Sequence, residues 1–201
     1  MNTYSIKKIY SSPDWSAIPT LNIATPYLDT PNNVTASAQL CYNDEALLVH
    51  LWANEPYTRA EERGIVGIPC LDSCLEFFFC PEDGDSRYFN IEFNSNGCMF
   101  LGFGSSVEDL IRIVPEDPEQ KFFPHQISKT EKGWEIFYSI PYSFIRRIFP
   151  NFEVYSGKRM QANCYKCSDL TEPANYLSWS PIVGEPFTFH KPHCFGTMIF
   201  E

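Results

Sequence analysis

Strict alternation of apolar and polar residues is the feature that most constrains the fold of this chain. In Tyr88–Asn94 every second side chain is apolar, and the positions between them are Asn90, Glu92 and Asn94. Successive side chains of a strand point to opposite faces of its sheet, so this pattern predicts a strand with one core face and one polar face. The Asn96-Gly97 pair that follows predicts a hairpin turn into the next strand.

The same period recurs along the chain. Further segments with strand patterning are residues 47–54, 74–80, 98–103, 122–128, 133–140, 159–165 and 194–201. Sixteen prolines and ten glycines keep the elements short, and residues 141–149 carry the pattern of one short helix. With about ten strands and no linker, the sequence predicts a single all-β domain over residues 1–201, an antiparallel two-sheet β-sandwich of jelly-roll type.

Charge and hydropathy limit the partners of the domain. The formal net charge of −10 repels phosphate backbones, which argues against nucleic acid, whereas a neutral sugar is indifferent to it. No apolar run approaches the length of a membrane span, and the amino terminus lacks the apolar stretch of a secretory signal. We therefore expect no membrane partner and, with Met1 as the native start, a cytoplasmic location.

The eight cysteines permit more than one interpretation. Cys70, Cys74 and Cys80 lie close together in the sequence, and Cys164 and Cys167 form a CxxC motif. A zinc site of the usual spacing needs a second CxxC or an HxxxH, and neither is present. In a reducing compartment free thiols behave as small buried apolar groups, which is the interpretation we favour over a metal or redox role.

Several strands carry polar or aromatic residues on the side away from the core. These residues are His50, Trp52, Glu76, Asn90, Glu92, Gln161 and Asn163. Planar amides and carboxylates pair with sugar hydroxyls, and an aromatic ring stacks on the apolar face of a pyranose, so neighbouring strands of this kind would form a sugar-binding surface. The alternative is an ordinary solvated sheet face, with Glu76 held by a structural partner such as a buried Arg.

Four segments in order resemble the family 9 carbohydrate-binding modules, which are best known as appendages of xylanases. The segments are Asp72–Phe78, similar to an Asp-Ser-x-Glu strand, Tyr88–Asn94, Gly157–Asn163, similar to Gly-x-x-x-Gln-x-Asn, and Phe189–Gly196, similar to aromatic-x-x-Pro-x-x-Phe-Gly. The resemblance spans residues 13 to 201 and implies an antiparallel β-sandwich that holds a saccharide end between two aromatic rings.

The resemblance also implies roles for individual residues. Glu76 falls on the acidic sugar-reading position, Gln161 on the amide position with Asn163 beside it, and Phe189 on one clamp aromatic. Asn90 falls where a basic residue is expected. The second clamp aromatic should precede Asp72, but residues 68–71 contain no ring. Residues that could supply it from elsewhere are Tyr57, Trp52 and Trp179.

The family's structural calcium provides one further expectation. The acidic turn with Asp83 and Asp85 is a weak candidate for it, and a solvated turn is the commoner meaning of such a sequence. We otherwise expect no cofactor.

Two other functions remain open at this point. A glycosidase needs two carboxylates across the sugar bond, and Glu76 and Glu92 are the available pair, although no local motif marks either as catalytic. An interaction domain that has lost sugar binding is favoured by the missing ring. We predict a non-catalytic carbohydrate-binding domain with a saccharide ligand.

Overall fold

The computed structural model describes residues 2–28, 30–117 and 121–201, and these residues form fourteen strands and four short helical segments. The strands are β1 (Thr3–Lys8), β2 (Leu21–Ile23), β3 (Thr25–Tyr27), β4 (Thr35–Tyr42), β5 (Ala46–Asn54), β6 (Cys74–Cys80), β7 (Tyr88–Asn94), β8 (Met99–Gly104), β9 (Ile111–Arg112), β10 (His125–Lys129), β11 (Gly133–Pro141), β12 (Arg159–Ser168), β13 (Asn175–Ser178) and β14 (Gly196–Phe200). The all-β class predicted from the alternation is confirmed.

The helical segments are short connections at the ends of strands. The 3₁₀ turns are η1 (Trp15–Ala17), η2 (Pro69–Leu71) and η3 (Pro192–Cys194), and the α-helix is α1 (Tyr142–Ile145). The helix expected over residues 141–149 is thus confined to one turn, which Arg147, Ile148 and Phe149 continue as hydrogen-bonded turns onto Phe144 and Ile145. In the part of the chain that the structure describes, no helix has the length and apolar character needed to cross a membrane.

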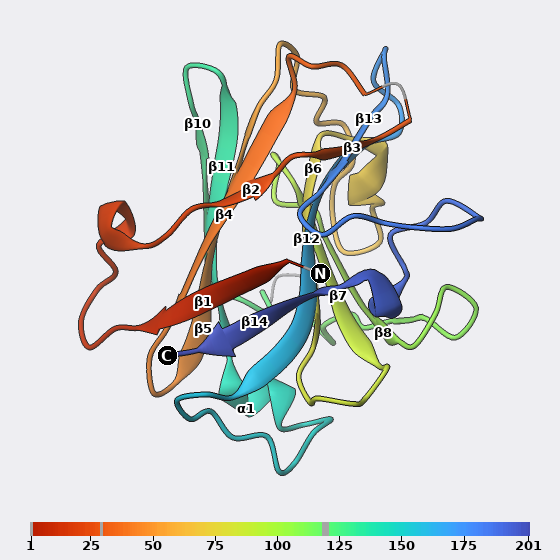
Figure 1. Ribbon diagram of the computed structural model, residues 1–201. Helices are drawn as coiled ribbons and strands as arrows, with labels where there is room; N and C mark the ends of the chain where they lie inside the picture. Colours follow the sequence, from red (N-terminus) through yellow and green to blue (C-terminus); the bar gives the residue numbers. More distant parts are fainter. Residues whose placement is uncertain (1, 29, 118–120) are drawn as a thin grey trace.

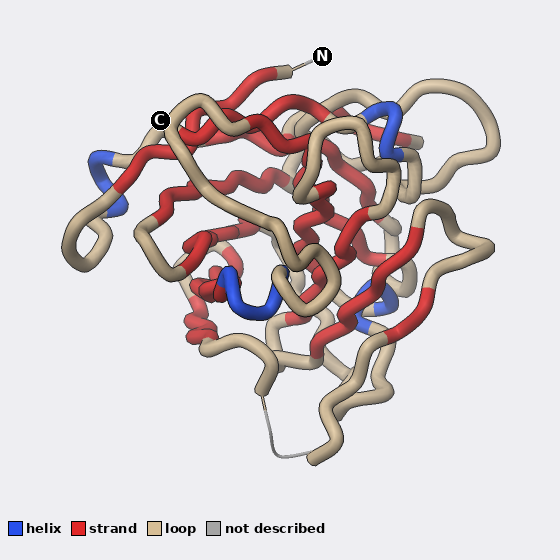
Figure 2. The backbone as a smooth tube through the Cα atoms, turned by 90° about the horizontal axis from the view of Figure 1, so that it is seen from below, coloured by secondary structure: helices blue, strands red, loops and turns tan. Residues whose placement is uncertain are grey.

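The strands pair in two groups that β1 joins into one curled sheet (Figure 1). One group has the order β10-β11-β5-β4, with β2 pairing along β4, and the other has the order β14-β12-β6-β7-β8-β9, with β13 on β12 and β3 on β13. Between these groups β1 pairs with β14 through Thr3–Ile6 and with β4 through Lys7 and Lys8. Viewed along the strands, the sheet curls around a common interior (Figure 2).

The expectation of a wholly antiparallel architecture is wrong, because β1 is parallel to both of its partners. β1 lies between β4 of one group and β14 of the other. Its chain direction therefore decides whether it pairs with them in parallel or antiparallel fashion. The alternation pattern of Thr3–Lys8 specifies which side chains are buried and is silent on the direction of the neighbouring strands.

The core fills the space between the two groups. Leu75, Phe77 and Phe79 of β6 and Phe89, Ile91 and Phe93 of β7 meet Val49 and Leu51 of β5 and Ile136 of β11 in one apolar cluster. The apolar half of the Tyr88–Asn94 alternation therefore faces the interior, as predicted. The other half of the same strand points to the outer side of β6, β7 and β12, and this side holds the residues singled out from the sequence.

Candidate functional site

Strand register places five of the predicted residues on the outer face of β6, β7 and β12, namely Glu76, Asn90, Glu92, Gln161 and Asn163. Glu76 lies directly opposite Glu92 on β7 and opposite Tyr165 on β12. One pair further along, Phe78 lies between Asn90 and Asn163. The predicted shelf of carboxylates and amides therefore exists. It is not a solvated face, however, because Glu76, Asn90 and Asn163 are each 2% exposed or less.

Glu76 is held by a thiol rather than by the buried arginine considered from the sequence. The Cys167 Sγ donates to the Glu76 Oε1 at 2.9 Å. Burial raises the pKa of the Glu76 carboxyl well above its usual range, and the adjacent Glu92 carboxyl raises it further, since two negative charges in one dry site repel each other.

Glu92 is the less buried residue of the pair, with 7% of its surface exposed against 2% for Glu76. Burial raises the pKa of Glu92 to about 7, and the hydrogen bond from the Asn90 amide, at 3.0 Å, opposes that shift. The Asn90 Oδ1 on the other side of the same amide is buried and has no hydrogen-bond partner among the described residues. An unpaired acceptor of this kind is costly unless another donor satisfies it.

Asn163 and Gln161 differ in what their amides do. The Asn163 Nδ2 donates to the Ser180 carbonyl at 3.0 Å and its Oδ1 accepts from the Ser180 N–H at 2.8 Å, so this amide fixes the start of the segment after β13. Gln161 is half-buried and accepts a long, 3.4 Å bond from the Thr197 hydroxyl. Gln161 lies four residues before Tyr165 on β12, and Tyr165 is the residue that pairs with Glu76. Gln161 is therefore about 13 Å from the Glu76 position, measured along the strand.

Phe189 comes to the same face but is not an open ring. It stacks on Tyr165 with centroids 4.2 Å apart and planes 7° apart, and the Tyr165 hydroxyl donates to the Phe189 carbonyl at 3.0 Å. Phe189 is 8% exposed and belongs to a second apolar cluster, which covers the outer face together with Phe78, Tyr88 and Phe195. Residues of the carboxy-terminal segment therefore cover much of the predicted shelf.

The two predicted tryptophans do not join Glu76. Trp52 lies on the outer side of β5 in the other strand group, where it stacks on His50 at 4.7 Å, and His50 in turn contacts Trp15 and Phe137. Trp179 is part of the interior cluster, with its ring against Gly196. Trp52 and Glu76 both face outward, but from strands of different groups.

The acidic turn does not have the geometry of a calcium site. The Asp85 carboxylate is bonded to the Arg87 guanidinium at 2.6 to 3.2 Å, and Glu82 pairs with Lys158 at 3.1 Å. These carboxylates are already neutralised by side-chain cations, and Asp83 is exposed beside them. The expectation that Asp83 and Asp85 hold a metal ion is therefore not supported by the contacts they make.

The Asp-Ser part of the first motif has a structural role. Asp72 is fully buried and its Oδ2 accepts from the Glu61 and Glu62 N–H groups and from the Asn94 side chain. The Ser73 hydroxyl accepts from the Arg59 N–H at 3.0 Å. These bonds fasten the loop before η2 to the end of β7, and so they set the position of Cys70.

The sequence did not identify two residues at the Cys74–Cys167 end of the face, which we call its open end because both are only partly buried there. Cys70, half-buried on η2, lies in the segment where the missing clamp ring was expected, and Glu92 is the charged group that most strongly affects its thiol. Tyr176 on β13 is half-exposed, and its ring lies edge-on to Phe187 and Phe189. Burial and the nearby Asp169 carboxylate raise the pKa of Tyr176 to about 12. Residues 175–178 read Asn-Tyr-Leu-Ser and do not alternate, so no local pattern singled out Tyr176.

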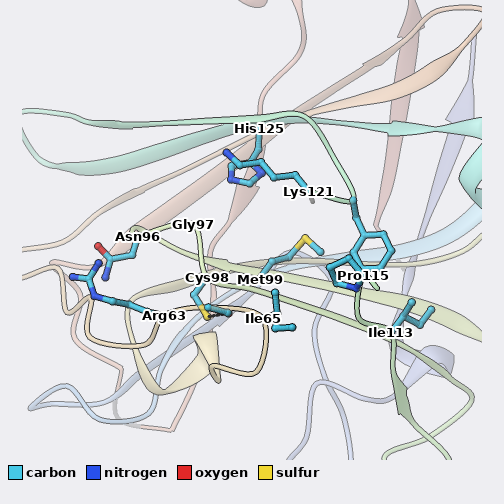
Figure 3. Close-up of a pocket in the computed structure, with 12 residues that line it drawn as sticks. Arg63, Ile65, Asn96, Gly97, Cys98, Met99, Ile113, Pro115, Lys121 and His125 are labelled. Atoms are coloured by element: carbon cyan, nitrogen blue, oxygen red, sulfur yellow. Dashed lines mark hydrogen bonds between the residues drawn. The ribbon is translucent and has the colours of Figure 1, made fainter. Parts of the chain in front are cut away.

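A separate hollow of about 410 Å³ lies beyond the β7–β8 hairpin (Figure 3). Met99 and Ile113 form its apolar floor, and Arg63, Asn96, Lys121 and His125 surround it. None of the residues predicted to bind a saccharide lines this hollow. The hollow is a second place where a small ligand could be accommodated.

Comparison with known proteins assigns the family. The family model for carbohydrate-binding family 9 matches residues 14–200, which is nearly the whole chain. The chain belongs to carbohydrate-binding family 9. It is therefore a non-catalytic carbohydrate-binding domain, as predicted, and the assignment does not favour the glycosidase alternative. No curated protein matches the chain.

Solved structures agree on the fold of this family 9 domain. It resembles a "putative carbohydrate-binding protein" from Bacteroides uniformis, with a TM-score of 0.81 and 28% identity over 99% of both chains. It also resembles a family 9 module from Caldicellulosiruptor kristjanssonii at 13% identity. The structure of that module with glucose gives a TM-score of 0.68, covering 98% of this chain and 95% of the module. The structure with cellotriose gives 0.67, covering 100% and 94%.

Proposed function

We propose that this family 9 domain binds the end of a neutral saccharide at the open end of the β6-β7-β12 face, around Glu92. The two strand groups act as the layers of a β-sandwich, and the ligand lies on the outer side of one layer. The Asn90–Glu92 pair is the observation that carries the proposal, because it combines an unpartnered buried acceptor with the less buried carboxyl of the Glu76–Glu92 pair.

The polar groups of this pair suit sugar hydroxyls. A carboxylate accepts from two adjacent hydroxyls of a pyranose, and the Asn90 Oδ1 needs a donor that the described residues do not provide. A neutral ligand also avoids the repulsion that the −10 net charge imposes on anions. Glu76 lies behind Glu92 and supports the floor, because its carboxyl is engaged by Cys167.

Tyr176 provides the stacking surface in this proposal. Its ring is half-exposed, and the buried rings of Phe189 and Tyr165 pack behind it, so the contact is rigid. On the opposite side Cys70 offers a thiol where the resemblance implies a ring. A ring contact contributes about 0.5–1.5 kcal/mol beyond area burial, so one-sided stacking weakens binding by up to about tenfold relative to a two-ring clamp.

The known ligands of a structural neighbour guide the choice of probe. The family 9 module from C. kristjanssonii has been solved with glucose and with cellotriose. We therefore propose a glucose-type saccharide end for this chain as well, and both sugars are the first ligands to test.

Calorimetric titration of the intact chain with glucose and with cellotriose tests this proposal. We expect saturable binding that Tyr176→Ala and Glu92→Gln each weaken by about tenfold or more, since each removes on the order of 1.4 kcal/mol. The controls are Trp52→Ala, on the other strand group, and His125→Ala, in the separate hollow, and both should bind as the unaltered chain does.

Two outcomes would contradict the proposal. Loss of binding in His125→Ala with retention in Glu92→Gln would move the ligand to the hollow of Figure 3. The absence of any heat with either sugar, in a chain shown to be folded, would favour the interaction domain that has lost sugar binding.

A further inference from the structure

The pairing of β6 with β12 brings two cysteines and a glutamate to one point inside the domain. Cys74 and Cys167 are direct partners in the register, and Glu76 is the next outward-facing residue on β6. The two Sγ atoms and a Glu76 carboxylate oxygen all lie within 4.8 Å of one another. Each of the three residues is 2% exposed or less. The cluster could not be predicted from the sequence, because Cys74 and Cys167 lie far apart in the chain. Only the pairing of their strands brings them together.

The ligand types of this cluster select for a particular class of metal ion. Thiolate sulfur is a soft ligand that binds Zn²⁺ and related ions, whereas Ca²⁺ and Mg²⁺ take oxygen ligands alone. In a tetrahedral zinc site, bonds of about 2.0–2.3 Å place neighbouring ligand atoms about 3.3–3.8 Å apart. The three ligand atoms of this cluster already lie within 4.8 Å of one another, which is close to this spacing.

The charge of the floor favours a cation at the same point. Glu76 and Glu92 are direct neighbours, and the basic side chains that act on them are engaged elsewhere. Lys166 pairs with Glu55 at 3.1 Å, and Arg112 donates to three backbone carbonyls. A divalent ion would therefore take the place of the proton that this carboxyl pair otherwise holds, since these side chains do not neutralise the pair.

A fourth coordination position lies toward Cys70. The Cys70 carbonyl is 3.9 Å from the Cys167 sulfur, and the half-buried Cys70 thiol borders the end of the face that solvent reaches.

We propose that Cys74, Cys167 and Glu76 form a binding site for a thiophilic divalent cation such as Zn²⁺, with the fourth position facing Cys70. Binding converts two thiols to thiolates and requires Glu76 as its carboxylate, so the protons that these three groups hold are released to solvent, and no oxidation is involved. The site is distinct from the proposed saccharide contacts, which are made by Glu92, Asn90 and Tyr176.

Titration of the metal-free, reduced chain with Co²⁺ tests the site directly. We expect one equivalent to bind with visible bands of tetrahedral Co²⁺ and an ultraviolet sulfur-to-cobalt band, and we expect Zn²⁺ to displace it. Changing Cys74→Ala and Cys167→Ala together should abolish the sulfur band. Glu76→Gln, which keeps the side-chain volume, should weaken binding by about tenfold or more, since it replaces an anionic ligand with a neutral one.

The matched control is Cys80→Ala, which removes an equally buried thiol from the same strand and the same face. It should bind Co²⁺ as the unaltered chain does. The proposal is overturned if the folded chain binds no Co²⁺ or Zn²⁺, or if the sulfur band survives in the double variant. Because no sugar is present, these results are independent of the saccharide titration.

Discussion

Glu76 and Glu92 are direct neighbours across the β6–β7 pair, and both carboxyl groups are buried on the outer face of the sheet. Two carboxyl groups in such a site are stable when at least one holds a proton. The pair therefore links the stability of the domain to pH, in addition to forming the floor of the proposed saccharide site.

The first prediction concerns this pH dependence in metal-free protein. Because the pKa of Glu92 is raised to about 7, the folded chain keeps a proton that the unfolded chain releases near pH 4.5. The free energy of unfolding should thus fall as pH rises between these values, by up to about 3 kcal/mol. Urea unfolding at a series of pH values measures this change in the free energy of unfolding.

Glu92→Gln should remove the part of the slope that Glu92 contributes and raise stability at about pH 8, above the Glu92 pKa, relative to the unaltered chain. The raised pKa of Glu76 keeps a remaining slope of the same sign. The control is Glu45→Gln, which changes an exposed carboxyl and should leave the slope unchanged. A slope in Glu92→Gln as steep as that of the unaltered chain would contradict the assignment.

The second prediction concerns Asn163, whose amide closes two hydrogen bonds with the Ser180 backbone. Asn163→Ala leaves a buried N–H and a buried C=O of Ser180 without partners, and should destabilise the domain by about 2–4 kcal/mol. Gln161→Ala, at a half-buried position of the same strand, should cost less than about 1 kcal/mol. Equal losses in urea unfolding would show that Asn163 has no special structural role.

The sequence predicts individual strands of this domain well because alternation is a local property. Tyr88–Asn94 and its hairpin at Asn96-Gly97 follow from period and turn chemistry, and the structure confirms both. The parallel direction of β1 could not be predicted, since it depends on which edges the strand meets after the sheet has curled.

The candidate site was predictable only in part, for the same physical reason. Alternation shows that Glu76 and Trp52 face away from the core, but it does not tell which strand group each belongs to. The outer face is covered by the irregular segment that carries Phe189. This segment has no repeating apolar pattern from which its path could be predicted. The Cys74–Cys167 contact depends on register between strands that are distant in sequence.

The third prediction concerns Gly196 and Trp179, which are in close contact at the end of the fourth motif. A Cβ atom at position 196 would lie 2.6 Å from the Trp179 ring. Gly196→Ala should therefore destabilise the domain by about 1–3 kcal/mol through overpacking. Adding Trp179→Phe, which shortens the ring system, should make the effect of Gly196→Ala smaller. A thermal unfolding cycle of the four proteins measures the coupling, and simple additivity would contradict it.

The fourth prediction concerns the buried ion pair of Lys166 and Glu55. The Lys166 ammonium is fully buried and lies 3.1 Å from the Glu55 carboxylate, which also accepts from the Trp134 indole N–H at 3.0 Å. Lys166→Met leaves that carboxylate buried without its cation, so it should destabilise the domain by about 3–5 kcal/mol. Adding Glu55→Gln removes the uncompensated charge while keeping an acceptor for Trp134, and should recover part of the loss in urea unfolding. If the double variant is less stable than Lys166→Met alone, the cost does not arise from the unpaired charge.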